Sequence, residues 1–270
     1  MFDLIIVTYN ALPKLKRCLD SIARHTSKIP YSLTILDNCS QDGTRRFLGQ
    51  YQKKINVQVL HTPKNLGFSG GANFILRRTS KPFIALLDDD IELTAGWLEK
   101  LYRHLQSKPK VGMVGPKIVN TNGKIHSADI SIRPLGSLGW TEKDEGQRDY
   151  VRECDALTGP CWLLRREVFQ KVGPFDEQFF PSQYEDIDYC MRVRLAGFKI
   201  IYDGRIKVWH GNLLRDGGYK QNQANFIRFR RKWEKHFRHF PLKDSHPHLK
   251  LLGDGAGYFY AVVRKNENRS

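Results

Sequence analysis

The chain has 270 residues, of which 40% are hydrophobic, so it can bury the core of one large domain or two small ones without disulfide support. Its five cysteines are scattered and lack a Cys-x-x-Cys spacing, which argues against a disulfide framework or a thiolate zinc site and favours a reducing cytoplasm. The formal charge of +16 suits an anionic partner, although a solvated basic surface is the simpler explanation.

The first 120 residues alternate short apolar runs with amphipathic stretches. We expect strands at Leu4–Val7, Leu33–Leu36, Val57–Leu60, Phe83–Leu87 and Val111–Val114, and helices at Leu12–Arg24, Gly43–Tyr51, Ser69–Arg78 and Ala95–Gln106. This order predicts an α/β fold with a mainly parallel, doubly wound sheet covered by helices on both faces. The first apolar run has only the length of a strand, so we expect neither a signal peptide nor a membrane span.

Beyond residue 119 the pattern weakens before order resumes. Gly, Ser, Asp and Lys dominate between Asn120 and Cys154, which predicts an irregular insertion or lid on the acceptor side. The later ordered stretches are Leu157–Arg166, Phe175–Phe180, a helix at Glu185–Leu195, strands at Lys199–Tyr202 and Ile206–Trp209, and a basic amphipathic helix at Asn225–Phe240. The polar residues from Val262 onward are expected to fray.

Polar residues follow the predicted parallel strands at their carboxyl ends, where such sheets form the ligand crevice. They are Thr8, Tyr9 and Asn10 after the first strand, Asp37 after the second, Asn65 and Gly67 after the third, and Asp88, Asp89 and Asp90 after the fourth. The sequence therefore predicts that four loops converge on one site.

The aspartate run Asp88-Asp89-Asp90 brings like charges together, and such charges repel unless a cation neutralises them. Carboxylate oxygens suit Mg²⁺ or Mn²⁺, which complete their shells with substrate phosphates and water. The alternative is a solvated acidic turn at the start of the next helix.

Two further features favour a metal-dependent site. The cluster Glu185-Asp186-x-Asp188 could face the aspartate run and supply a general base, or it could be an ordinary acidic helix start with Asp188 and Arg192 paired. His210 ends a predicted strand and could supply a nitrogen ligand, or it could be a hydrogen-bonded structural residue.

The glycine-containing loop from Asn65 to Asn73 lets backbone N–H groups approach a diphosphate or a sugar hydroxyl at a helix N-terminus. It is neither a P-loop nor a dinucleotide-binding fingerprint. Asp37 could accept hydrogen bonds from a ribose or base, or it could serve only as a turn residue.

Together these segments resemble family 2 glycosyltransferases, which have the GT-A fold of nucleotide-diphospho-sugar transferases, and among them the rhamnosyltransferase-like and galactofuranosyltransferase-like members. The resemblance covers roughly residues 3 to 235. Its motifs are Ile6-Val7-Thr8-Tyr9-Asn10, Leu36-Asp37-Asn38, Asp42-Gly43-Thr44, the run Asn65 to Asn73, Leu86-Leu87-Asp88-Asp89-Asp90, Thr158-Gly159-Pro160-Cys161, Gly173-Pro174-Phe175-Asp176-Glu177, Tyr184-Glu185-Asp186-Ile187-Asp188 and Trp209-His210.

The resemblance implies roles for individual residues. The donor nucleotide would be held by Thr8, Tyr9, Asn10, Asp37, Asn65, Gly67, Asp88 and Asp89; the metal, Mn²⁺ or Mg²⁺, by Asp90, His210 and Asp88; and the acceptor or sugar would contact Gly159, Trp209 and Glu185. Asp186 would be the catalytic base of an inverting, single-displacement transfer. Residues 1–118 would bind the sugar nucleotide, 119–213 would form the acceptor and catalytic half of the same domain, and 214–270 a basic helical extension.

The implied function is transfer of a sugar from a UDP-, GDP- or dTDP-sugar to a glycan or lipid-linked acceptor in polysaccharide or cell-envelope biosynthesis. We expect a cytoplasmic protein whose basic helix contacts the anionic inner face of the membrane. The alternative is a basic membrane- or nucleic-acid-binding module without transferase activity, and nucleic acid is the less favoured partner. Nucleotidyl transfer is disfavoured, because Thr8-Tyr9-Asn10 replaces the Gly-rich, basic loop of that class.

Overall fold

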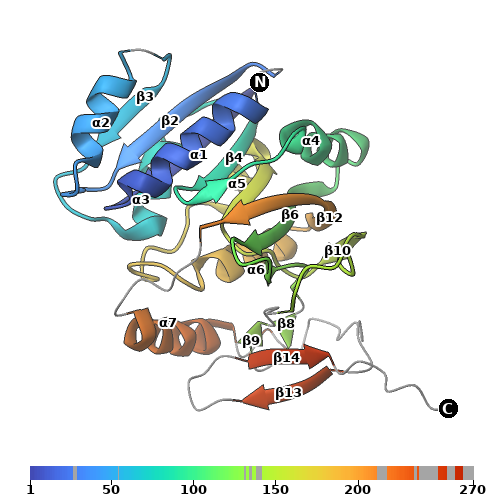
Figure 1. The fold of residues 1–270 in the computed structure, drawn as a ribbon. Coiled ribbons are helices and arrows are strands. Elements are labelled where there is room, and N and C mark those ends of the chain that lie inside the picture. Colours follow the sequence, from blue (N-terminus) through green and yellow to red (C-terminus); the bar gives the residue numbers. More distant parts are fainter. Residues whose placement is uncertain are drawn as a thin grey trace.

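The computed structural model describes residues 1–26, 29–53, 55–130, 132–133, 136–137, 142–211, 218–233, 236, 249–253 and 259–263. Its first half alternates strands and helices as the sequence predicts (Figure 1). These are β1 (Phe2–Thr8), α1 (Leu12–His25), β2 (Tyr31–Asp37), α2 (Thr44–Tyr51), β3 (Gln58–His61), α3 (Gly67–Leu76), β4 (Phe83–Asp88), β5 (Ile91–Glu92) and α4 (Trp97–Ser107).

The second half completes the sheet and adds further helices, of which α7 lies lowest in the view of Figure 1. Its elements are β6 (Val111–Asn120), β7 (Ile125–Ser127), β8 (Ile132–Arg133), β9 (Gly136–Ser137), β10 (Val151–Cys154), β11 (Cys161–Arg165), α5 (Arg166–Val172), α6 (Glu185–Leu195), β12 (Lys199–His210), α7 (Gly218–Trp233), β13 (Leu249–Gly253) and β14 (Phe259–Val263). No described helix combines the length and the apolar character needed to cross a membrane.

A ten-stranded sheet runs in the order β10-β12-β6-β11-β4-β1-β2-β3, with β5 beside β12 and β7 beside β6. The four strands from β4 to β3 are parallel to one another, as are β12 and β6. β11 is antiparallel to both of its neighbours, β4 and β6. The sheet is thus mixed but mostly parallel, and the carboxyl ends of β1, β2 and β4 share one edge.

Two hydrophobic cores lie on opposite faces of this sheet, because successive side chains of a strand point to opposite sides. On one face, Leu4 and Ile6 of β1 pack with α1, α2 and α4. On the other face, Ile5 packs with residues of α3, α5, α6 and α7. Burial of both faces explains why the central strands read as continuous apolar runs.

The segment between Asn120 and Cys154 differs from the irregular insertion that we expected. β6 continues to Asn120, β7 folds back against it, and β10 adds an antiparallel edge strand beside β12. The sequence pattern was too weak here because these strands are short and carry few apolar residues. Residues 131, 134–135 and 138–141 of the expected lid lie outside the described part.

The expectation of two separate strands near the end of the domain was also wrong. A single strand, β12, runs from Lys199 to His210, and its pairing with β6 shifts register between Asp203 and Lys207. The expected C-terminal helix is observed as α7, which begins at Gly218 and ends at Trp233. Phe229 and Trp233 are buried against the core as the spacing predicted, whereas positions 237–240 lie outside the described residues.

Candidate active site

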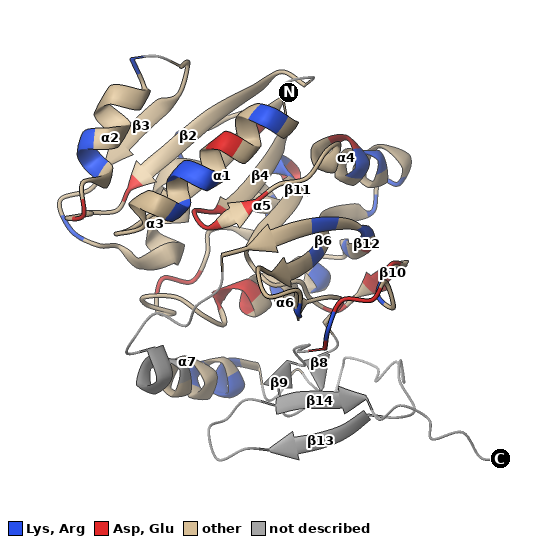
Figure 2. Cartoon of the chain, viewed as in Figure 1, with Lys and Arg blue, Asp and Glu red and all other residues tan. Residues whose placement is uncertain are grey.

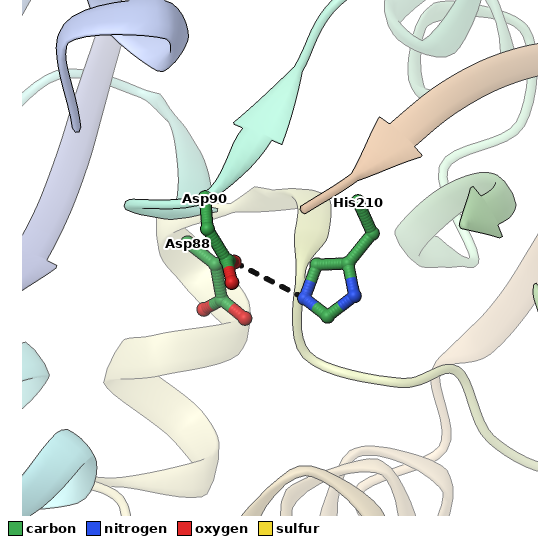
Figure 3. A group of neighbouring side chains, drawn as sticks. All are labelled: Asp88, Asp90 and His210. Carbon is green, nitrogen blue, oxygen red and sulfur yellow. Dashed lines mark ion pairs between the residues drawn. The ribbon is translucent and has the colours of Figure 1, made fainter. Parts of the chain in front are cut away.

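Asp88, Asp90 and His210 gather at the carboxyl edge of the sheet (Figure 3). One ligand atom from each of them lies within 4.8 Å of the others. Asp88 ends β4, Asp90 precedes β5, and His210 ends β12 in register with Ile91 of β5. Pairing of β5 with β12 therefore brings the histidine to the aspartates across a sequence separation that no local pattern encodes.

The carboxylate of Asp90 lies between a histidine and a lysine. His210 Nε2 is 3.1 Å from Oδ1, and Lys14 Nζ is 3.2 Å from Oδ2. Although burial opposes ionisation, the hydrogen bond and charge of His210, together with Lys14, hold the pKa of Asp90 well below its usual range. Burial acts against the charged form of His210 as well, but Asp90 and Asp88 raise the pKa of this imidazole.

A second histidine, which the sequence analysis did not single out, lies beside the first. The ring of His126 on β7 is 4.7 Å from the ring of His210. Burial and the neighbouring His210 lower the pKa of His126 to about 4, so this imidazole is neutral near pH 7. The pairing of β7 with β6 places His126 there. In the sequence alone, His126 is one polar residue in a segment without a clear pattern.

These side chains fit a divalent cation. Carboxylate oxygens suit Mg²⁺ and Mn²⁺ alike, and an imidazole ligand favours Mn²⁺, the softer of the two. Nε2 is the nitrogen of His210 that faces the two aspartates, whereas Nδ1, which is buried without a hydrogen-bond partner among the described residues, points away from them (Figure 3). The predicted group of Asp88, Asp90 and His210 is thus assembled at one point.

The loops after β1 and β4 contact each other. The backbone N–H of Tyr9 points toward Oδ2 of Asp89 at 3.4 Å, and Asp89 is buried. The Thr8 hydroxyl is also buried, without a partner among the described residues. A polar atom that is buried and unpaired costs free energy, and a ligand at this edge could satisfy it.

The loop after β2 is held by Asp37 and its neighbours. Asp37 is almost fully buried and accepts a hydrogen bond from the Ser40 N–H at 2.9 Å, while His61 Nδ1 lies 3.1 Å from its other oxygen. Asn10 joins this loop, because its Oδ1 accepts a hydrogen bond from the Gln41 N–H at 2.7 Å. Asp37 and Asn10 thus hold these turns in place, which is the structural role that the sequence analysis gave as the alternative for Asp37. This role is compatible with contacts to a donor nucleotide.

The glycine loop before α3 is fixed by Asn38, which the sequence analysis quoted only as part of a motif. The Asn38 amide donates to Asn65 Oδ1 at 2.9 Å and to the Gly67 carbonyl at 3.0 Å. Gly67 has a φ of +70°, and a Cβ there would lie 2.8 Å from the Pro181 carbonyl oxygen. Glycine is required at this position for both reasons.

The acidic cluster Glu185-Asp186 opens α6 on the other side of the crevice. Burial and the charge of Asp186 raise the pKa of Glu185, and burial raises the pKa of Asp186. Asp186 accepts backbone hydrogen bonds from Gly159 at 3.0 Å and Ile187 at 2.8 Å. Glu185 Oε2 is buried without a partner among the described residues, so this acid is incompletely satisfied.

The loop before β11 connects this acidic pair to the metal-binding group. Pro160 accepts a hydrogen bond from the Asp88 N–H at 3.0 Å, while the preceding residue, Gly159, donates to Asp186. The Thr158 hydroxyl is buried and unpaired within the described chain. Antiparallel insertion of β11 beside β4 therefore sets the base candidate close to the aspartates.

Trp209 lies apart from these contacts, and Asp188 has a structural role. Trp209, expected on the acceptor side, has the Lys207 ammonium 5.3 Å from its ring centre. Asp188 anchors α7, since its carboxylate accepts from Trp233 Nε1 at 2.8 Å and pairs with Arg192 at 3.0 Å. The helix-pair explanation of Asp188 is confirmed.

A mostly parallel sheet of this order, with carboxylates at its carboxyl edge, is the arrangement of the GT-A fold. Structural comparison supports this fold: GalNAc-T7, solved with UDP, GalNAc and Mn²⁺, matches with a TM-score of 0.72 at 16% identity over 88% of this chain and 49% of that one. The chain belongs to Glycosyl transferase family 2, whose profile matches residues 3–173, and it is therefore a glycosyltransferase.

Curated relatives agree with this family assignment. An N-acetylglucosaminyl-diphospho-decaprenol L-rhamnosyltransferase of Mycobacterium tuberculosis is 28% identical over 236 residues, which are 78% of this chain and 76% of that protein. The uncharacterized protein y4gI of Sinorhizobium fredii is 27% identical over 253 residues, and there the match spans 87% of this chain but only 28% of the relative. The resemblance to rhamnosyltransferases expected from the motifs is thus confirmed.

Proposed function

We propose that this chain is an inverting glycosyltransferase that moves a sugar from a nucleoside-diphosphate sugar to a hydroxyl of a glycan or lipid-linked acceptor. The observation that carries the proposal is the position of Asp186. It is a half-buried carboxylate with a raised pKa, joined through Gly159 and Pro160 to the backbone of Asp88. The loop that contains Gly159 and Pro160 therefore contacts both the proposed base, Asp186, and the proposed metal ligand, Asp88.

Asp88, Asp90 and His210 would hold the divalent cation, and Mn²⁺ in the GalNAc-T7 structure is consistent with this choice. The bound cation would neutralise negative charge on the departing nucleoside diphosphate. The three residues come from β4, the following turn and β12, and the pairing of β5 with β12 links this turn to His210. Mg²⁺ is the second candidate, since two of the three ligands are carboxylates.

The donor nucleotide would lie against the loops after β1, β2 and β3. Thr8, with its buried unpaired hydroxyl, and Tyr9 border the aspartate run, while Asp37 anchors the neighbouring turn. Asn65 accepts a hydrogen bond from the Gly67 N–H at 2.8 Å and shapes the third loop. We propose that Asn10 and Asp89 also contact the donor nucleotide.

Asp186 would take the proton from the acceptor hydroxyl as the acceptor oxygen attacks the anomeric carbon. The bond from that carbon to the diphosphate oxygen breaks in the same displacement, so the configuration inverts and no covalent enzyme intermediate forms. Burial suits Asp186 to this role, because a raised pKa makes the carboxylate a stronger base. Glu185, Gly159 and Trp209 would contact the sugar or the acceptor.

A lipid-linked acceptor is favoured by the diphospho-decaprenol in the name of the M. tuberculosis relative and by the exposed face of α7. Ile227 is 49% exposed there, and Arg230 and Arg231 are also exposed. Lys and Arg positions are blue along this part of α7 in Figure 2. Such a face could dock on an anionic membrane, where this acceptor would be presented. We therefore place the protein at a membrane surface in polysaccharide or cell-envelope biosynthesis, with residues 1–118, 119–213 and 214–270 as donor, acceptor and docking parts.

The test combines donor hydrolysis or transfer with nucleotide binding. Wild-type protein with Mn²⁺ should release a nucleoside diphosphate from one of the UDP-, GDP- or dTDP-sugars when a polyprenyl-diphosphate-linked sugar is added, and NMR of the product should give an inverted anomeric configuration. Asp186→Asn should bind the same nucleotide with unchanged affinity and lose transfer. A retained configuration, or loss of nucleotide binding in that variant, would refute the proposed mechanism.

A further inference from the structure

Each carboxylate oxygen of Asp90 contacts a nitrogen-bearing side chain in the structure. His210 Nε2 contacts Oδ1 at 3.1 Å and Lys14 Nζ contacts Oδ2 at 3.2 Å. A carboxylate oxygen can accept more than one contact, but a divalent cation bound to Asp90 would repel a positive group held against the same carboxylate. The two partners differ in how they can respond to such a cation.

Lys14 is the partner that has to leave. An ammonium group has three donors and no lone pair, so it cannot ligate a metal and repels it at close range. His210, in contrast, has ring nitrogens that can ligate and belongs to the metal-binding group. Lys14 also has a flexible four-carbon side chain that is 25% exposed, whereas the side chain of His210 is 14% exposed and β12 holds its backbone.

The position of Lys14 in α1 also favours an anionic partner for this side chain. It lies in the first turn of the helix, which contains no acidic residue. The N-terminal end of a helix is electropositive, so a lysine there is unfavourable unless an anion lies nearby. Asp90 supplies that anion in the structure, and a diphosphate at the same edge of the sheet would supply a stronger one.

We propose that Lys14 is a diphosphate-binding residue of the donor site, which neutralises Asp90 until a metal ion takes its place. When Asp90 engages the metal, the Lys14 ammonium moves to the diphosphate oxygens of the donor. The inference rests on the proposed function, because it needs a nucleoside-diphosphate donor at this edge. It assigns Lys14 a role that none of the motifs discussed above contains.

The proposal predicts opposite effects of one substitution on two ligands. Lys14→Gln removes the competitor of the metal, so Mn²⁺ alone, titrated by electron paramagnetic resonance, should bind about five- to tenfold more tightly. The same change removes a charge-assisted contact, so at saturating Mn²⁺ the affinity for a nucleoside diphosphate should fall about tenfold. Calorimetry with UDP, GDP and dTDP measures this loss, and affinity for the matching nucleoside monophosphate should fall less.

Lys16→Gln is the matched control. Lys16 lies on the same helix turn and carries the same charge, but its ammonium is over the Phe47 ring at 5.2 Å. This variant should bind both ligands like the wild type. Unchanged or weaker Mn²⁺ binding in Lys14→Gln, or unchanged diphosphate affinity, would overturn the role of Lys14. If wild-type protein binds none of the three diphosphates, the proposed function itself fails, which is a different and recognisable result.

Discussion

The backbone N–H of Gly159 donates to Oδ2 of Asp186 at 3.0 Å. The next residue, Pro160, accepts from the Asp88 N–H at 3.0 Å, so two consecutive residues contact both sides of the crevice. Any shift of β11 against β4 would therefore move the candidate base relative to the metal-binding edge. This arrangement explains why a loop of modest sequence signal belongs to the site.

The pH dependence of transfer should report the Asp186 carboxyl. Burial raises its pKa to about 6, so the carboxyl is protonated below that pH and cannot accept a proton from the acceptor. We expect kcat/KM to fall about tenfold per unit as the pH drops below about 6, and to level off above about 7. Rates of nucleoside diphosphate release between pH 4.5 and 8.5 measure this profile.

Glu185→Gln provides the control for this assignment. Burial and the neighbouring Asp186 raise the pKa of Glu185, and glutamine has the shape of the uncharged acid but does not titrate. The inflection near pH 6 should remain in this variant even if the rate falls. A profile that stays flat from pH 5 to pH 8 in the wild type would exclude Asp186 as the titrating base.

Removal of the proposed metal ligand Asp90 should abolish metal-dependent turnover. Asp90→Asn keeps the shape of the side chain but removes a charge that contacts both His210 and Lys14, so we expect Mn²⁺ affinity to fall at least tenfold. Chelation with EDTA should stop the wild-type enzyme, and added Mn²⁺ should restore it. Turnover like that of the wild type in Asp90→Asn would disprove the metal site.

Glu92→Gln is the matched substitution outside the group of metal ligands. Glu92 lies two residues further along the chain and forms an exposed pair with Arg17 at 3.1 Å. Exposed pairs contribute little to stability, roughly 0 to 1 kcal/mol. Mn²⁺ binding and turnover should therefore stay at wild-type levels, which shows that loss in Asp90→Asn is specific to its position.

Gly67→Ala should destabilise the fold and disturb the donor loop. The residue has a φ of +70°, and its new Cβ would lie 2.8 Å from the Pro181 carbonyl oxygen, a position fixed by the Phe68 N–H. We expect a loss of about 2–4 kcal/mol in the free energy of unfolding, from strain and overlap together. Denaturant unfolding followed by circular dichroism measures it.

Two other glycines separate these causes. Gly123 has a φ of +80° but open space around the Cβ position, so Gly123→Ala should cost only the strain of about 1 kcal/mol. Gly49 lies in α2 with open space, and Gly49→Ala should stabilise the protein by about 0.5–1 kcal/mol. If all three variants unfold alike, the packing argument for Gly67 is wrong.

The exposed face of α7 should bind anionic membranes. Arg230→Gln with Arg231→Gln removes two charges near the exposed Ile227, and each basic residue at such a surface contributes about 1 kcal/mol. We expect sedimentation with phosphatidylserine vesicles to weaken about tenfold or more, and wild-type binding to fall with salt.

The control for membrane binding is Arg24→Gln with Lys53→Gln, which removes equal charge from exposed positions on other elements. This pair should bind vesicles almost like the wild type. Equal losses in the two double variants would indicate a general effect of net charge. Affinity for RNA or DNA without affinity for vesicles would instead favour the nucleic-acid-binding alternative.

Much of the first half of the fold could be predicted from the sequence. The apolar runs of β1, β2 and β4 are buried on both faces, which gives a strong local signal, and the parallel arrangement places Thr8, Asp37 and Asp88 at one edge. The second half was harder because β7 and β10 are short, with partly exposed residues that alternate weakly. Local patterns do not encode which distant strand such a segment will join.

The amino-acid sequence by itself determined the kinds of side chain at the site, the order of the strands that carry them and the motifs of the family. Only the tertiary structure decided which side chains meet. β5 pairs with β12 and brings His210 to Asp90, β7 folds back to place His126 beside His210, and α1 presents Lys14 to the same carboxylate. These contacts join residues far apart in the chain, and they depend on strand pairing and helix packing that are set by burial of the whole core.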